Sequence, residues 1–138
     1  PSSGCAETIE SVTPIVIQRW IDIIEHRRTD ELDSLLADDA VFYSPVVFTP
    51  QEGKAKTAAY LAAAAHLFAG TGFHYVEQWF APRSAVLEFA AEIDGIYVNG
   101  VDIISWNDDD KIVSFKVMMR PLKALQKIMP EMARLLEL

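Results

Sequence analysis

The stretch that decides the fold is SAVLEFAAEIDGIYVNGVDIISW, residues 84–106. Apolar side chains recur at alternate positions on both sides of Asp94-Gly95, a pair that is typical of the tight turn in a β-hairpin. The two flanking segments are therefore predicted to pair as antiparallel strands. The second of them also carries Asp102, a carboxylate in a mostly apolar run.

Two further segments extend this hairpin into a meander. One segment precedes it and ends at the turn that contains Pro82, and the other follows it after the acidic turn Asn107–Asp110. Connections this short require neighbouring strands to run antiparallel. The predicted strands are residues 73–80, 84–93, 96–106 and 111–119.

Helical periodicity dominates the sequence before the meander. A first helix is predicted to begin at Thr13-Pro14 and to end near His26, with Thr13 as its N-cap and Pro14 in its first turn. A short helix is predicted from Thr29, and an alanine-rich helix over residues 54–69. The apolar face of the short helix would consist of Leu32, Leu35 and Leu36.

The remaining segments complete the predicted architecture. Residues 40–43 read as a short strand, residues 50–53 as a loop, and residues 122–135 as an amphipathic helix that is kinked or split at Pro130. Helices followed by an antiparallel meander indicate an α+β fold. We expect a curved antiparallel sheet packed on N-terminal helices, with a C-terminal helix.

Composition restricts the partners of the protein. The sequence has 138 residues, 51% of them hydrophobic, and a formal net charge of −8. This length predicts one domain, which we assign to residues 8–138 behind a flexible N-terminal segment, residues 1–7. The acidic balance argues against nucleic acid and anionic membrane surfaces, which require clustered Lys and Arg. No signal peptide or apolar run of ~20 residues is found, so we expect a cytoplasmic protein without membrane contact.

Motifs for cofactors and metals are missing from the sequence. The single cysteine, Cys5, excludes an internal disulfide and a C-x-x-C site. The sequence has no Gly-rich phosphate loop and no nucleophile elbow. His66 and His74 lack companion ligands, and Asp108–Asp110 lacks the later Gly and Glu of an EF-hand loop. We therefore expect no cofactor and no metal.

Asp102 is the strongest candidate for a functional residue. A carboxylate among Val, Ile and Trp is costly to bury in its ionised form, so it either finds a partner or keeps its proton with a raised pKa. In one interpretation it is a proton donor or general acid/base in an apolar cavity. In the other it is a structural group paired with Arg120, Lys116 or a backbone N–H.

Several short motifs occur in a characteristic order along the chain. They are LLADDAVF at 35–42, Ser44-Pro45, Gly53, GVDII at 100–104, DDKI at 109–112 and MMRPL at 118–122. The combination is similar to the nuclear transport factor 2-like superfamily, in its SnoaL-like polyketide cyclase and ketosteroid isomerase-related branch, over about residues 8–130. The resemblance implies a cone-shaped, cystatin-like sheet around an apolar cavity, and a homodimer formed through the sheet face.

The chemistry of individual branch members transfers only in part. Ketosteroid isomerases use a carboxylate base and an oxyanion hole made of a tyrosine and a protonated aspartate. Asp102 matches that aspartate, but Trp20 stands at the tyrosine position and Ser44 at the position of the base. Because serine is no base at neutral pH without activation, we expect no classical ketosteroid isomerase activity. Val117 replaces the last aspartate of limonene-epoxide hydrolases, which disfavours that activity too.

What the resemblance leaves is the SnoaL-type cyclase, which acts through a single acid/base carboxylate, here Asp102. We expect a small hydrophobic, carbonyl-containing ligand, with Trp20, Tyr43 or Ser44 as the donor that holds its oxygen. Each of these side chains can instead have no functional role, with Trp20 packed in the core and Tyr43 and Ser44 on the surface at the end of a strand. The other expected contacts are Tyr60, Ile104, Val117 and Met119.

Three classes of function remain open from the sequence. The protein is an isomerase or cyclase, a binding protein that holds a hydrophobic ligand without chemistry, or a dimeric interaction module whose cavity is filled by side chains. An open cavity of a few hundred Å³ would favour the first two classes.

Overall fold

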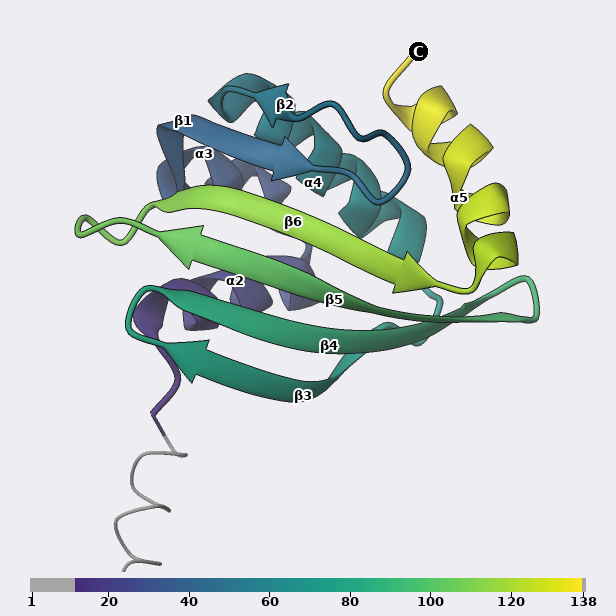
Figure 1. The fold of residues 1–138 in the computed structure, drawn as a ribbon, viewed down its shortest axis with the longest axis horizontal. Coiled ribbons are helices and arrows are strands. Elements are labelled where there is room, and N and C mark those ends of the chain that lie inside the picture. The colour runs from purple at the N-terminus through teal and green to yellow at the C-terminus, as the bar shows by residue number, and fades with distance from the viewer. Residues whose placement is uncertain (1–11, 138) are drawn as a thin grey trace, which may run out of the picture.

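The structure is a computed structural model that describes residues 12–137 (Figure 1). It has the expected α+β architecture, with a curved, unclosed sheet of six strands and helices gathered on one of its faces. The segment 1–7, which we expected to be flexible, lies outside the described residues. The single-domain assignment stays a prediction.

The sheet contains the predicted meander and two additional pairings. Its strand order is β2-β1-β6-β5-β4-β3, and only the contact between β1 and β6 is parallel. Asp94 and Gly95 have φ angles of 51° and 81°, as the predicted two-residue turn requires. The strands are β1 (Leu36–Tyr43), β2 (Gln51–Glu52), β3 (His74–Ala81), β4 (Ser84–Ile93), β5 (Ile96–Trp106) and β6 (Ile112–Arg120).

The helices cover the inner face of this sheet and one of its ends. In Figure 1, α2 and α4 lie behind the strands, and α5 stands at the end of the sheet where β6 finishes. The opposite face carries no helix of the described chain. The helical segments are α2 (Ile15–His26), η1 (Thr29–Glu31), α3 (Leu32–Leu35), α4 (Lys54–Phe68) and α5 (Leu122–Leu135).

The first strand is longer than predicted. It begins at Leu36 instead of residue 40, and its pairing with β6 shifts register between Leu36 and Val41. Leu36 is 1% exposed, so its burial agrees with the prediction although it lies in β1 and not in the short helix. Periodicity could not separate the two, because a single buried leucine fits either element. Residues 51 and 52, predicted as loop, form β2 against β1.

Two predictions about helix ends were wrong. Thr13 is not the N-cap of α2, because the helix begins at Ile15 and Pro14 is the capping residue, without a side-chain cap. The C-terminal helix is not split, since α5 runs through Pro130. Pro130 lies on the exposed side of α5, so water can reach the backbone carbonyl that the proline leaves without a donor.

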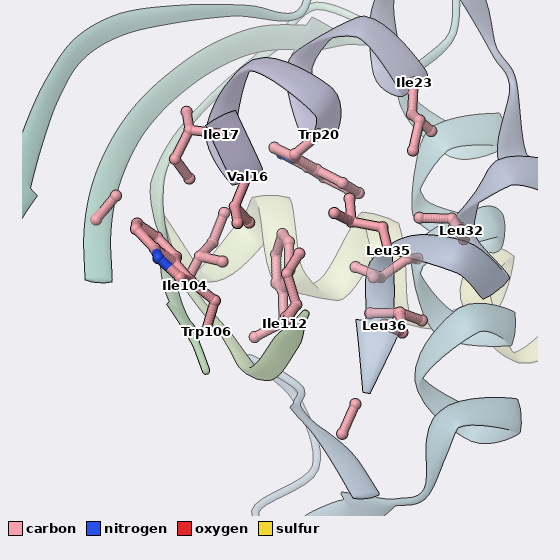
Figure 2. Packing of buried hydrophobic residues seen from close by; sticks show 14 of the residues in the cluster. Val16, Ile17, Trp20, Ile23, Leu32, Leu35, Leu36, Ile104, Trp106 and Ile112 are labelled. Carbon is pink, nitrogen blue, oxygen red and sulfur yellow. The ribbon is translucent and has the colours of Figure 1, made fainter. Parts of the chain in front are cut away.

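The main core lies between α2, the short helix α3 and the inner face of the sheet (Figure 2). Figure 2 shows Val16, Ile17 and Trp20 of α2 on the side of that helix that faces Ile104 and Ile112. Fully burying a side chain of this size stabilises the fold by about 1.5–3 kcal/mol. This core anchors α2 against the strands and so fixes the position of Trp20.

Gly100 makes room for a ring on the inner face of β5. A Cβ atom at this position would lie 2.5 Å from Cζ of Phe89 and 2.9 Å from Cβ of Met119. The ring of Phe89 therefore lies over β5 just two residues from Asp102, where any larger residue at position 100 would displace it. Gly100 thus allows the apolar side chains of Phe89 and Met119 to pack beside Asp102.

Candidate functional site

A cavity of about 680 Å³ opens between the inner face of the sheet and the helices. Its walls come from α2, α4, α5, the loop after β1 and the inward side chains of β3–β6. Most of the lining is apolar, and rings are prominent in it. The aromatic lining residues are Trp20, Phe42, Tyr60, Phe68, Phe73, Tyr75, Phe89 and Phe115.

Ring contacts make these walls continuous. Trp20 packs edge-on against Phe115, with ring centroids 4.8 Å apart, and Phe42 stacks on Tyr60 at 5.1 Å. On the other side, Phe73 stacks on Phe89 at 5.1 Å. Packed rings have few rotamers and present flat surfaces. The cavity therefore has flat, apolar walls.

One chain of hydrogen bonds crosses the inner face of the sheet. The indole N–H of Trp20 donates to the hydroxyl oxygen of Tyr75 at 2.9 Å, and the Tyr75 hydroxyl donates to Oδ2 of Asp102 at 2.6 Å. The three side chains come from α2, β3 and β5. All three line the cavity.

Asp102 is buried and titrates near neutrality. It is 5% exposed and lies between Leu87 of β4 and Val117 of β6. Burial raises the pKa of Asp102 from 3.8 to about 7, and the hydrogen bond from Tyr75 opposes that rise by stabilising the carboxylate. The pKa of Tyr75 is raised well above its ordinary value by burial and by the neighbouring carboxylate, so its hydroxyl keeps its proton.

These contacts assign different roles to the two carboxyl oxygens. Oδ2 accepts the hydrogen bond from Tyr75, which leaves Oδ1 as the atom for a ligand. Protonated Oδ1 donates to a carbonyl oxygen, whereas ionised Oδ1 accepts a proton or a hydrogen bond. Near pH 7 both forms are populated, which is the condition for a carboxyl group to serve as an acid or a base.

The expected site residues fall into two groups in the structure. Tyr43 and Ile104 do not line the cavity. Phe42 points inward, so its neighbour Tyr43 points outward and lies under the Lys116 ammonium, 5.0 Å from its ring centroid. Ile104 is fully buried in the main core instead. The expected residues that do line the cavity are Asp102, Trp20, Ser44, Tyr60, Val117 and Met119.

The structure also settles which group pairs with Asp102. Neither Arg120 nor Lys116 contacts it, because Arg120 donates to Asn99 and Lys116 lies over Tyr43. The indole N–H is the only donor of the Trp20 side chain, and it bonds to the Tyr75 hydroxyl. Trp20 therefore positions the Tyr75 hydroxyl and has no donor left for a ligand. The Ser44 hydroxyl oxygen accepts hydrogen bonds from the backbone N–H groups of Val46 and Val47. Within residues 12–137, no hydrogen bond donated by the Ser44 hydroxyl is found.

Tyr75 is the functional residue that the sequence analysis missed. It lies 27 residues before Asp102, and a bulge between Tyr75 and Glu77 breaks the alternation of β3. The sequence offered no signal for it, because counting back from the β3–β4 turn pairs Phe89 with Val76, whereas the bulge pairs Phe89 with Tyr75.

Two negative findings concern the part of the chain that the structure describes. Within residues 12–137, no group of three or more His, Cys, Asp or Glu side chains is arranged to hold a metal ion. Over the same range, no helix combines the length and the apolar character needed to cross a membrane.

The curved sheet with an internal cavity defines the class of protein as nuclear transport factor 2-like, or cystatin-like. Residues 17–115 match the model of the SnoaL-like domain, and the chain belongs to that family. The search of curated proteins gave no match.

Solved structures of similar fold come from several proteins. A steroid delta-isomerase from Pseudomonas aeruginosa is 35% identical, with a TM-score of 0.82 over 87% of this chain and 88% of that one. A protein with a cystatin-like fold from Silicibacter pomeroyi is 26% identical, with a TM-score of 0.80 over 86% and 83%. The epoxide hydrolase/cyclase-like enzyme SalBIII, at 17% identity, has a TM-score of 0.63 over 78% and 89% and shares the fold.

Proposed function

We propose that this protein binds a small, flat, carbonyl-containing molecule in the cavity and moves a proton on it with Asp102, as a cofactor-free isomerase or cyclase. The observation that carries the proposal is the buried Asp102 carboxyl, held through Oδ2 by Tyr75 in an aromatic cavity of about 680 Å³. The 35% identity to a steroid delta-isomerase supports this type of reaction.

The proposed step begins from the ionised carboxylate. Oδ1 of Asp102 takes a proton from the carbon next to the carbonyl, so that the C–H bond breaks, an O–H bond forms and an enolate remains. The Ser44 hydroxyl is the proposed donor to the enolate oxygen. In a ligand with a C=C bond next to that carbon, the enolate is conjugated with the double bond. Asp102 then returns its proton to the far carbon of the double bond, which shifts the double bond and completes an isomerisation without net gain or loss of atoms.

In this proposal the same carboxyl both takes the proton and returns it. Ser44 stands where ketosteroid isomerases of this branch place their base, and serine does not accept a proton at neutral pH without activation. A raised pKa compensates in part, because a group that titrates near the working pH both takes and releases a proton readily.

A second candidate function is binding without chemistry. The serine at the base position favours it, since the mostly apolar cavity then holds no carboxylate at the position of the family's base. The third candidate, an interaction module with a filled cavity, is disfavoured by the open volume of about 680 Å³.

Binding of 1-tetralone, a bicyclic ketone with one oxygen, tests the proposal. We expect a Kd below about 1 mM, since apolar burial and one hydrogen bond are available to so small a ligand. The measurement is an NMR titration, in which the shifted amide signals should belong to cavity residues such as Tyr75, Val117 and Met119. The proposed ligand class would be contradicted if the shifted signals belonged to residues outside the cavity. It would also be contradicted if this ketone did not bind up to its solubility limit.

The proposal includes a homodimer formed through the outer face of the sheet, in the cytoplasm. This face carries large exposed side chains, among them Val76, Trp79 and Met118, which are 54%, 52% and 53% exposed. The strand registers place Glu77 and Glu88 on it near β3, and Lys116 near the other edge. Two copies related by a twofold axis would bring opposite charges together around an apolar centre.

Sedimentation analysis checks the dimer. The wild type is expected to sediment as a dimer at micromolar concentration, and Trp79→Glu as a monomer, because the substitution buries one unpaired charge from each copy in the interface. Trp79→Phe is the matched control and should remain dimeric. A monomeric wild type would remove this part of the proposal and leave the cavity chemistry untouched.

A further inference from the structure

The bulge in β3 allows two polar side chains of one strand to face the cavity. Tyr75 pairs with Phe89 and Gln78 with Leu87, so both face the cavity although three positions separate them. Gln78 keeps the register that the β3–β4 turn sets, and the bulge beyond it brings Tyr75 inward in place of Val76. Tyr75 and Gln78 are the only half-buried positions of β3, and the other six are exposed.

Gln78 lies in the same row of the sheet as Asp102. The row runs from Gln78 through Leu87 and Asp102 to Val117, and it consists of directly paired residues. Two strand spacings separate the backbones of Gln78 and Asp102, which is about 10 Å. No other polar side chain stands between them in this row, because Leu87 fills the intervening position.

The amide of Gln78 is available to a ligand. Within residues 12–137 the recorded side-chain bonds of β3 involve Tyr75 and His74, and none involves Gln78. Gln78 is partly buried and lines the cavity, so it presents an amide donor and an amide acceptor to whatever the cavity holds. Partly desolvated polar groups of this kind give a site its specificity.

We infer that Gln78 is a specificity-determining residue, and that the ligand carries a second oxygen group at the end opposite the carbonyl that reacts at Asp102. This inference rests on the proposed function, because it assumes that a carbonyl compound occupies the cavity. A flat ligand that lies along the row would reach both polar side chains, with Leu87 beneath its apolar middle. The proposed ligand is therefore a flat ring compound with an oxygen-containing group at each of its two ends.

Two matched ketones test the inference. 6-Hydroxy-1-tetralone differs from 1-tetralone by one hydroxyl at the end away from the carbonyl. We expect the wild type to bind the hydroxylated ketone about 5- to 10-fold more tightly, the size of one net hydrogen bond. Gln78→Leu keeps a side chain of similar size and removes the amide, and it should bind both ketones equally. Calorimetry with each ketone and each protein gives the four constants required.

The outcomes separate this inference from the proposal beneath it. An unchanged preference in Gln78→Leu, or no preference in the wild type, would overturn the role of Gln78 while binding of 1-tetralone still upholds the cavity. Failure of the wild type to bind either ketone would overturn both. Glu77→Leu is the control on the outer face. It should keep the wild-type preference for the hydroxylated ketone, because the Glu77 side chain points away from the cavity.

Discussion

Replacing Asp102 with asparagine is expected to stabilise the folded protein at pH 8 by about 4 kcal/mol. The folded-state pKa of Asp102 is raised from 3.8 to about 7 by burial. Each unit of pKa difference between the folded and unfolded states corresponds to about 1.36 kcal/mol of stability. Asparagine resembles the protonated carboxyl in shape and still accepts the hydrogen bond from Tyr75, but it never ionises.

The direction follows from proton binding in the two states. Between pH 4 and pH 7 the folded protein holds a proton on Asp102 that the unfolded chain has released. Raising the pH through this range therefore favours the unfolded chain, and the contribution of Asp102 levels off above about pH 7. The wild type and Asp102→Asn should be nearly equal in stability below pH 4, and the variant should be more stable above pH 7.

Urea unfolding at intervals between pH 4 and pH 8 measures this difference. Subtracting one profile from the other removes the carboxylates that both proteins share. Asp109→Asn is the matched control, because its side chain is exposed at the tip of the β5–β6 turn and stays in water in both states. A constant difference between wild type and Asp102→Asn across the range would show that Asp102 is not held in a poorly compensated environment.

A stabilising substitution at this position has a functional meaning. Leucine or asparagine would serve the fold better than an aspartate whose carboxylate is desolvated and has one hydrogen bond from the protein. Proteins retain such unfavourable groups where activity requires them. The predicted gain in stability is thus an argument that Asp102 is kept for chemistry.

The fold could be predicted where the signal was local. The Asp94-Gly95 turn sets the register of β4 against β5, and apolar alternation then decides which side chains face inward, including Asp102. The resemblance to the SnoaL-like branch was confirmed by the family match. The parallel pairing of β1 with β6 was not predictable in this way, because it joins segments about 70 residues apart with no turn between them.

The candidate site was less predictable because it depends on strand parity and on one bulge. Tyr43 was expected in the cavity, but Phe42 takes the inward position and the next residue of a strand must face outward. Tyr75 was overlooked because an extra residue in β3 brings it inward, where the count from the β3–β4 turn places Val76. A register shift of one residue moves every side chain of a strand to the opposite face of the sheet. An error of one residue in the predicted register therefore assigns the wrong side chains to a site.

Catalysis of hydrogen exchange at a ketone is expected to depend on the same carboxyl. In heavy water, the wild type should speed the exchange of the hydrogens next to the carbonyl of 1-tetralone, and Asp102→Asn should lose about 100-fold or more of that acceleration. The reason is that an amide cannot take a proton from carbon. The reaction is followed by the loss of the proton signal of the ketone in NMR spectra.

The pH dependence makes this prediction specific to Asp102. The ionised form is the base, so the exchange rate should rise with pH and reach half its maximum near the pKa of Asp102, about 7. Affinity for 1-tetralone should change only a few-fold in Asp102→Asn, because the apolar walls and the amide donor remain. That comparison separates lost chemistry from lost binding.

Each alternative gives a different pattern. A binding protein would hold 1-tetralone without accelerating exchange in either form, and Asp102 would then tune affinity alone. Equal acceleration by the wild type and Asp102→Asn would mean that another group moves the proton, and the mechanism built on Tyr75 and Asp102 would be wrong. The proposed chemistry requires acceleration that is lost with the carboxyl while the ligand still binds, since the carbon-bound proton is transferred to the buried Asp102 carboxylate.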